Sequence, residues 1–232
     1  EVAPFTVDLL LPSGAENLNY VLYTDESPYK MQREWLDRLP FDIYSVNVHT
    51  GAKRLIGRSY RTAPKWSVNG KWAVMYDPIA QVWNKFDGAT GKVVNISDAI
   101  GYPMFMESYD KPAPAPAYGI AGWTADGNNV FLYDAYDWWK IDLTGERQPE
   151  CLTKGYGRKH GKSIRKMTSN IDKDVFQKDE KVIVSLWDKD TMDEGVYQLD
   201  MKGRLRKLME GNYVYTIHRF SDNHEYCVWN RQ

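Results

Sequence analysis

One pattern of polar and apolar positions recurs along this chain: a polar turn, a short apolar strand, and an aromatic residue beside an Asp or Asn. It occurs five times, as ENLNYVLYTD (16–25), NGKWAVMYD (69–77), DGNNVFLYD (126–134), DEKVIVSLWD (179–188) and DNHEYCVWN (222–230). The aromatic residues that mark the copies are Tyr23, Tyr76, Tyr133, Trp187 and Trp229, at intervals of 53, 57, 54 and 42 residues. A phrase repeated at such intervals indicates a repeat architecture.

A second phrase follows each of the first four copies and predicts a β-hairpin. It reads DIYSVNVHTGAKRLIG (42–57), QVWNKFDGATGKVVNIS (81–97), DWWKIDLTGERQPECLT (137–153) and GVYQLDMKGRLRKLME (195–210). In each, an alternating strand meets a tight turn that ends in glycine, at Gly51, Gly91, Gly145 and Gly203. Glycine supplies the positive φ of such a turn, and the alternation predicts one buried face.

An aromatic residue also precedes three of the polar turns and predicts one more strand ahead of them, at Trp66, Trp123 and Phe220. The full unit is then four antiparallel strands, which is the blade of a β-propeller. We therefore predict an all-β propeller of four-stranded antiparallel blades. A β-sandwich also has many short strands, but it does not require the same phrases in the same order.

The repeats divide one propeller segment, 1–232, into blades and insertions. We expect the end of a preceding blade at 1–15, blades at 16–57, 58–97, 118–153 and 179–210, a Pro-rich extended excursion at 98–117, a basic insertion at 154–178, and the start of a further blade at 211–232. MQREWLDRL (31–39) predicts a short helix ended by Pro40. Since residues 6–11 can complete the fifth blade by one strand only, we expect a partial propeller of about four blades plus part of a fifth. The alternative is a compact propeller closed by its own ends.

Composition narrows the class further. Nine Trp and sixteen Tyr favour β structure. The net charge of −1, from 30 basic and 31 acidic residues, gives no reason to expect a nucleic acid partner. No apolar run reaches the length of a membrane span. Cys151 and Cys227 are expected to be free, half-buried thiols.

The stretch YGIAGWTADGNNVFLYDAYDWWKIDLTGE, with CLTKGYGRK after it, resembles the propeller of the prolyl oligopeptidase and dipeptidyl-peptidase family of serine peptidases, above all its large secreted bacterial members. The resemblance is specific over 118–158 and looser elsewhere, where KWSVNGKWAVMYD resembles the family's W-S-x-D-G-K with Asn69 in place of Asp. In that family a seven- or eight-bladed propeller caps an α/β-hydrolase domain that follows it in sequence. The resemblance implies an extracytoplasmic parent whose hydrolase domain lies outside these residues.

No catalytic residue is predicted within the chain. The family's nucleophile lies in Gly-x-Ser-x-Gly, whereas Ser59 and Ser163 are each followed by an arginine in place of the second glycine. The histidines, at positions 49, 160, 218 and 224, have no recognisable charge-relay partner. Dipeptidyl peptidases hold the substrate amino terminus with paired glutamates, but Glu34 lacks an adjacent glutamate, so this role is not carried over.

Signals for bound ions and cofactors are equally weak. The run from Gly155 to Ser163 lacks the glycine spacing of a phosphate-binding loop and is interpreted as a solvated basic loop. Asp188, Asp190 and Asp193 depart from the calcium-loop spacing and predict a polar hairpin tip. No Cys or His pair has zinc-ligand spacing. The repeated Tyr and Trp markers are assigned to blade packing, and we predict no metal, no cofactor and no identifiable substrate-binding residue.

Two functional hypotheses remain open, with a third less favoured. The first is a non-catalytic propeller segment of a secreted serine peptidase, which gates or positions peptide substrates for a C-terminal hydrolase domain of the same parent chain. The second is a stand-alone propeller that binds a glycan or a protein. A propeller glycosidase with paired carboxylates is the third, although the sequence does not indicate which carboxylates converge.

Overall fold

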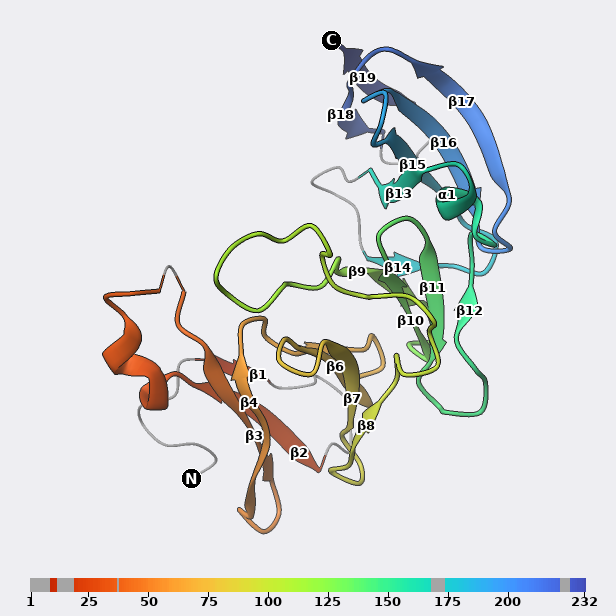
Figure 1. Ribbon diagram of the computed structural model, residues 1–232. Coiled ribbons are helices and arrows are strands. Elements are labelled where there is room, and N and C mark those ends of the chain that lie inside the picture. The colour runs from red at the N-terminus through yellow and green to blue at the C-terminus, as the bar shows by residue number, and fades with distance from the viewer. Residues whose placement is uncertain (1–8, 12–18, 37, 168–173, 222–225) are drawn as a thin grey trace. The chain divides into compact units, whose positions relative to one another are not determined.

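The computed structural model describes residues 9–11, 19–36, 38–167, 174–221 and 226–232, and these form an all-β structure (Figure 1). Two compact units are present. The first runs to Ala117 and includes Asp126–Asn128 and Leu143–Gly145, and the second holds the remaining residues from Tyr118 to Gln232. Each unit is built from sheets in which most neighbouring strands are antiparallel and consecutive in sequence.

The first unit contains two four-stranded sheets with the same strand order. One has the order β1-β2-β3-β4, with strands Leu9–Leu11, Tyr20–Asp25, Phe41–Asn47 and Lys53–Tyr60. The other has the order β5-β6-β7-β8, with strands Lys65–Trp66, Trp72–Asp77, Val82–Asp87 and Val93–Asn95. Both are the four-stranded meander that the repeat predicts.

The third sheet has the same meander with one strand added. Its order is β12-β11-β10-β9-β14, and β14 pairs with β9 in parallel. The strands of the meander are Ile120–Thr124 (β9), Asn129–Tyr133 (β10), Trp138–Asp142 (β11) and Glu150–Cys151 (β12), and the added strand is Val175–Phe176 (β14).

Two further sheets belong to the second unit. The fourth sheet has the order β13-β15-β16-β17, with strands Lys162–Lys166, Lys181–Asp188, Glu194–Asp200 and Leu205–Gly211. The fifth holds two strands, β18 (Tyr215–Phe220) and β19 (Cys227–Arg231). A single turn of helix, α1 (Tyr156–Lys159), precedes β13.

Apolar side chains from neighbouring sheets form a core inside each unit. In the first unit Leu22, Phe41 and Ile43 of one sheet pack with Met75 and Phe86 of the next. In the second unit a larger cluster joins the third and fourth sheets through Phe131, Trp138, Phe176, Val184, Leu186 and Leu199. Burial of these alternating positions is what selects strands over helices here. The marker residues Tyr23, Tyr76 and Tyr133 are buried, in agreement with their assignment to packing.

A glycine at the turn between β16 and β17 permits a close approach of two backbones. Gly203 has φ +80°, and a Cβ atom built there would lie 1.8 Å from the carbonyl oxygen of Leu152. Only glycine fits this position. The repeat therefore uses this hairpin glycine for contact with the preceding sheet as well as for its backbone conformation.

The structure differs from the sequence-based expectation between β2 and β3. A 3-10 helix covers Ser27–Gln32 instead of a helix over 31–39. Met31 and Trp35 are 90 % and 84 % exposed, and in the described part of 31–39 the buried apolar side chain is Leu39 at its end, which is too little to stabilise an α-helix.

Strand pairing also differs from two of the predicted segment boundaries, those of 1–15 and 154–178. Leu9–Leu11 pairs with β2 and so belongs to the first sheet, whereas the sequence assigned 1–15 to a preceding blade. The segment 154–178, expected as an insertion, contains α1, β13 and β14, and β13 is the first strand of the fourth sheet. Residues 1–8 and 12–15 lie outside the described part of the chain.

The Pro-rich segment 98–117 folds back on itself instead of extending over the surface. Phe105 and Ala117 form an antiparallel bridge, and Ile100 and Met104 are buried. The Tyr76 hydroxyl donates to the carbonyl oxygen of Ala115 at 3.1 Å, which ties the segment to β6.

The predicted all-β class is confirmed, and the repeated four-stranded antiparallel sheets have the strand order of propeller blades. The two cysteines are free and half-buried, as expected. None of the helices in the described ranges has the length and hydropathy needed to cross a membrane.

Candidate functional site

The irregular connections of each sheet gather at one of its ends. In a four-stranded meander the link from the second to the third strand and the chain leaving the fourth strand emerge at the same end. Here these links include the 3-10 helix segment 26–40, the folded loop 98–117 and the segment that carries α1. The hairpin turns at Gly51, Gly91 and Gly203 lie at the opposite end. Since binding groups concentrate on irregular connections, this end of each sheet, taken unit by unit, is a candidate functional surface.

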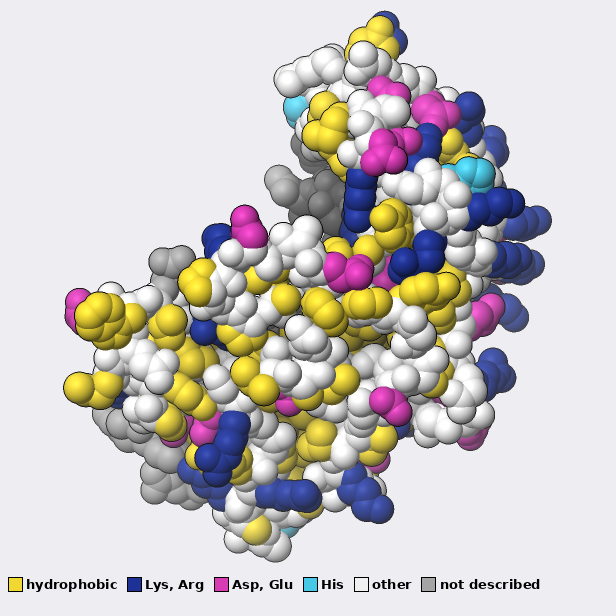
Figure 2. Space-filling model, viewed as in Figure 1, with side chains coloured by type: hydrophobic (Ala, Val, Ile, Leu, Met, Phe, Trp, Pro, Cys, Tyr) yellow, Lys and Arg dark blue, Asp and Glu magenta, His cyan; other side chains and the backbone are white. Residues whose placement is uncertain are grey.

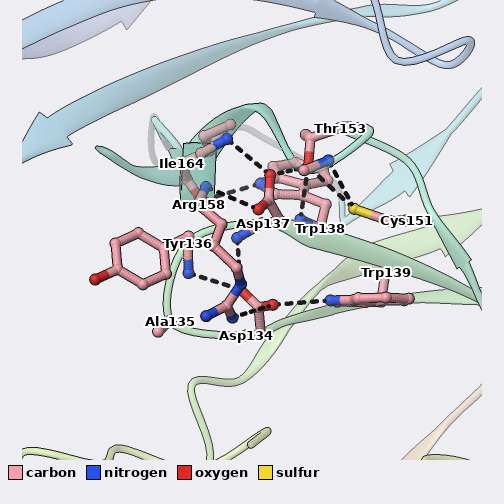
Figure 3. Close-up of polar contacts among 12 residues, drawn as sticks. Asp134, Ala135, Tyr136, Asp137, Trp138, Trp139, Cys151, Thr153, Arg158 and Ile164 are labelled. Carbon is pink, nitrogen blue, oxygen red and sulfur yellow. Dashed lines mark hydrogen bonds and ion pairs between the residues drawn. The ribbon is translucent and has the colours of Figure 1, made fainter. Parts of the chain in front are cut away.

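The centre of this end in the second unit is the buried carboxylate of Asp137, which lies between β10 and β11 (Figure 3). Its Oδ1 accepts the Thr153 hydroxyl at 2.6 Å and the Gly157 backbone N–H at 2.9 Å. Its Oδ2 accepts the Arg158 backbone N–H at 3.0 Å. One side chain thus holds the end of β12 and the start of α1 in place.

A second carboxylate, Asp134, lies three residues earlier and is fully buried. Its Oδ1 accepts the backbone N–H groups of Tyr136 and Asp137, both at 2.6 Å. Its Oδ2 accepts the indole N–H of Trp139 and the guanidinium of Arg158, both at 3.0 Å. Asp134 therefore fixes the β10–β11 turn and binds α1 through an ion pair (Figure 3).

Arg165 of β13 extends the network into the fourth sheet. Its guanidinium donates to the carbonyl oxygens of Asp134 and Ala135, at 2.7 and 3.2 Å, and to that of Ile164 at 2.8 Å. It also lies over the ring of Tyr133, 4.7 Å from the centroid. Burial lowers the pKa of Arg165. A buried cation is tolerated here because carbonyl dipoles and an aromatic face surround it.

The chemistry of this cluster is structural. Asp134 accepts four hydrogen bonds, which fill the lone-pair sites of a carboxylate, and Asp137 accepts three and is buried, so both carboxylates are engaged in holding the backbone. Cys151 lies beside them, and its Sγ accepts the Gly155 backbone N–H at 3.2 Å. Burial raises the pKa of the Cys151 thiol, which disfavours the nucleophilic thiolate. The arrangement can fasten loops and orient cations.

The side chains at the exposed side of the cluster are positively charged. The Arg158 side chain is 29 % exposed, and its guanidinium lies 5.0 Å from the centroid of the Tyr136 ring. Lys189 of the β15–β16 turn lies over the same ring at 4.2 Å. Figure 2 shows Lys and Arg side chains along the side of the second unit where Figure 1 places α1 and β17. Asp134 already pairs with Arg158, so Lys189 brings the less compensated positive charge to this surface.

The two serines considered from the sequence lie in strands. Ser163 belongs to β13 and is paired with Trp187. Ser59 has φ +56° in a bulge of β4, where its backbone N–H donates to the buried Asp42 carboxylate at 3.1 Å. The Tyr29 hydroxyl donates to the same oxygen at 2.6 Å, and burial raises the pKa of Tyr29. Neither serine occupies a strand-to-helix turn.

The remaining sequence candidates are spread over the chain. His49 contacts Asn19 at 3.2 Å, the His160 ring lies tilted against Tyr156 with centroids 4.4 Å apart, and His218 is exposed on β18. His224 lies outside the described residues.

The acidic candidates do not form a site either. Asp188 accepts the backbone N–H groups of Asp190 and Thr191 in a hairpin tip, as predicted. Glu34 is exposed in the 26–40 segment. Within the described ranges no group of His, Cys, Asp and Glu side chains is arranged to hold a metal ion.

Sequence reasoning did not identify the Asp134–Asp137–Arg158 cluster, although its signal was present. Asp134, Asp137 and Arg158 all lie within the stretch that most specifically resembles the peptidase propellers. Asp134 ends the repeated phrase, where Asp77 and Asp188 stand in two other copies. A second Asp, Asp137, lies three residues after Asp134 and has no counterpart in those copies. This additional carboxylate distinguishes the copy that carries the cluster.

Among known proteins, only solved structures are similar to this chain. No family model matches the sequence, and no curated protein matches it at a significant level. Among solved structures the chain is similar to a prolyl endopeptidase, at 12% identity over 94% of this chain and 31% of that chain, with a TM-score of 0.47. It is also similar to the β-propeller domain of the trilobed protease from Pyrococcus furiosus, at 11% identity over 96% of this chain and 65% of that one, with a TM-score of 0.44.

A third similar structure is not a peptidase. The dihydro-heme d1 dehydrogenase NirN matches at 12% identity over 99% of this chain and 42% of its own, with a TM-score of 0.48. This chain thus spans about a third of the prolyl endopeptidase and about two fifths of the dehydrogenase. Identities this low do not distinguish between these activities, and the propeller fold rests on the sheets described above.

Proposed function

We propose that this chain is the non-catalytic propeller segment of an extracytoplasmic, prolyl oligopeptidase-like serine peptidase. In this role it limits and orients the peptides that reach a hydrolase domain outside these residues. The observation that supports the proposal best is the buried cluster of Asp134, Asp137 and Arg158. It lies in the stretch with the most specific resemblance, and hydrogen bonds already occupy its carboxylates.

The proposed mechanism is steric exclusion by a rigid end of the propeller. A connection fixed by Asp137 and Arg165 cannot move aside for a folded protein, whereas a short or extended peptide can pass. The exposed cations Arg158 and Lys189 would attract the acidic groups of such a peptide, including its carboxyl terminus. Substrate discrimination would then depend on size and charge.

The test is a comparison of substrate lengths on the complete protein that carries this chain. We expect kcat/KM for a short peptide to exceed that for a long one, and Asp137→Asn to reduce this ratio by loosening the α1 segment. Asp179→Asn, at an exposed position of the same unit, is the matched control. Equal ratios for Asp137→Asn and the unmodified protein, with the variant folded, would overturn the gating role.

A further inference from the structure

The turn between β5 and β6 contains the one Asn-Gly pair of the sequence, Asn69-Gly70. In such a pair the backbone nitrogen of the glycine can attack the side-chain amide carbon of the asparagine, because glycine has no Cβ to obstruct the approach. The product is a five-membered succinimide ring, which water then opens. The contacts of Asn69 and Gly70 decide whether this reaction can occur in the folded chain.

Both ends of the Asn69 amide are hydrogen-bonded. Its Oδ1 accepts the Ser67 hydroxyl at 2.8 Å and the Lys71 backbone N–H at 3.1 Å. Its Nδ2 donates to the carbonyl oxygen of Asp126 at 2.9 Å and to Asn128 Oδ1 at 3.3 Å. The last two bonds reach the turn between β9 and β10, which belongs to the same compact unit. Two turns distant in sequence therefore fix the plane of this amide.

The attacking nitrogen is engaged as well. The Gly70 N–H donates to the Ser67 carbonyl oxygen at 2.8 Å, and Gly70 is buried with φ +65°. Attack requires that this nitrogen lose its proton to solvent base and turn toward Asn69 Cγ. A buried, hydrogen-bonded N–H exchanges its proton only when the structure around it opens. The folded turn thus withholds the nucleophile.

Gly127 covers the atom that would be attacked. A Cβ atom built on Gly127 would lie 2.7 Å from Asn69 Cγ and 2.7 Å from the Asn69 backbone nitrogen. The backbone of Gly127 can lie against the amide group because the residue has no side chain. The turn at 126–128 therefore both orients the amide and shields its carbon.

We propose that Asn69 is a site of spontaneous deamidation and that the contact with residues 126–128 suppresses the reaction in the folded chain. When the contact opens, the Gly70 nitrogen loses its proton to solvent base and bonds to Asn69 Cγ. The Cγ–Nδ2 bond breaks, and ammonia leaves with a proton from water. Water then hydrolyses one of the two ring carbonyls and leaves either aspartate or isoaspartate. The inference does not depend on the peptidase assignment.

Either product removes the contact that protected the asparagine. A carboxylate at position 69 has no hydrogen to donate to the Asp126 carbonyl oxygen, so two acceptors would face each other there. In isoaspartate the main chain also passes through the side chain, which lengthens the turn by one atom and displaces the Gly70 N–H from Ser67. The modification therefore marks, permanently, those chains in which the two turns have separated.

Two simpler explanations give different reaction rates. If the local sequence alone set the rate, the folded chain would react as fast as the unfolded chain. If burial of Gly70 alone protected the pair, substitutions within 126–128 would leave the rate unchanged. The proposal requires protection by the fold and loss of that protection when the 126–128 contact is disturbed.

The experiment follows aspartate and isoaspartate at position 69 by peptide mapping and mass spectrometry while the 232-residue protein is incubated in mildly alkaline buffer. The same chain unfolded in urea gives the unprotected rate. We expect the folded chain to react at least about tenfold more slowly, because only its locally open fraction reacts. Gly127→Ala should raise the rate in the folded chain by about tenfold, because the added Cβ displaces the Asn69 amide.

Gly51→Ala is the matched control. Its φ of +71° is close to the +69° of Gly127, but nothing lies within 4 Å of its added Cβ, so the rate at Asn69 should not change. Thermal unfolding shows whether each variant has folded. Equal rates in the folded and unfolded unmodified chain, or equal rates in folded Gly127→Ala and Gly51→Ala, would overturn the proposal.

A second variant keeps the test decisive if Gly127→Ala does not fold. Asn128→Ala removes one acceptor of Asn69 Nδ2 without adding an atom at the contact. It should raise the rate at position 69 by a smaller factor than Gly127→Ala. A folded Asn128→Ala that reacts no faster than the unmodified protein would then show that this contact does not protect Asn69.

Discussion

The Thr153 hydroxyl donates to Asp137 Oδ1 at 2.6 Å, and this bond joins the end of one sheet to the turn that begins its third strand. Both residues are buried, and the same carboxylate caps two backbone N–H groups near the start of α1. A single side chain thereby couples three segments that are up to 21 residues apart in sequence. The stability of this end of the second unit depends on it.

Asp137→Asn should destabilise the chain by about 1–3 kcal/mol. The amide nitrogen would meet an N–H donor where a carboxylate oxygen now accepts, so at least one buried donor loses its partner. Urea unfolding followed by tryptophan fluorescence measures the difference. Asp179→Asn is the control, and equal midpoints for the two variants would contradict the central position of Asp137.

Arg165→Lys should cost about 1–3 kcal/mol although it keeps the positive charge. A lysine ammonium cannot reproduce the planar fork that satisfies the carbonyls of Asp134, Ala135 and Ile164. Thermal unfolding measures the loss. Arg206→Lys, on the exposed part of β17, should change stability by less than about 0.5 kcal/mol. If the two substitutions change the stability equally, the hydrogen bonds of the buried Arg165 guanidinium do not stabilise this region.

Gly203→Ala should destabilise the chain by more than about 2 kcal/mol, because the added Cβ enters a position 1.8 Å from the Leu152 carbonyl oxygen and φ is positive. Gly51→Ala is the matched control: φ is +71° at a hairpin turn, but nothing lies within 4 Å. It should cost only about 1–2 kcal/mol. Equal losses would show that the two sheets do not approach closely at Gly203.

The ion pairs of Glu210 should make the free energy of unfolding depend on pH. Hydrogen bonds from Lys162 and then Lys207 lower its pKa from 4.5 to about 2. A lowered pKa in the folded state means that the ion pair stabilises the protein above about pH 4.5 and that this contribution is lost as the pH falls toward 2. Because both Lys162 and Glu210 are partly exposed, the effect should stay below about 1 kcal/mol.

The measurement is urea unfolding of the unmodified protein and of Glu210→Gln at several pH values. The difference in unfolding free energy between the two should be largest near neutral pH and should vanish near pH 2. A difference that persists unchanged at pH 2 would show that the Glu210 charge is not its source.

The sheets were predictable from sequence because their signal is local and repeated. The alternation in VWNKFD and the glycine at position 91 encode a hairpin whatever surrounds them, and β7 and β8 form as expected. The first strand was assigned to the wrong sheet because an apolar run such as Leu9–Leu11 does not specify its partner. The helix expected at 31–39 failed because amphipathic spacing stabilises a helix only where its apolar face is buried.

The site was harder to predict because its contacts are distant in sequence. Arg158 reaches Asp134 across 24 residues, and Arg165 reaches it across 31. Nothing in the local sequence distinguishes these two arginines from the other cations of a basic segment. The unmatched Asp137 was the one local signal, and only strand pairing shows which groups it can reach.

If the proposed function is right, the parent protein is a serine peptidase whose reactive serine lies outside this chain. The most direct measurement is to isolate the native protein with an antibody against residues 1–232, label it with a fluorophosphonate and locate the modified residue by mass spectrometry. We expect a labelled serine outside residues 1–232, within Gly-x-Ser-x-Gly. A label on Ser59 or Ser163, or a protein that takes up no label, would contradict it.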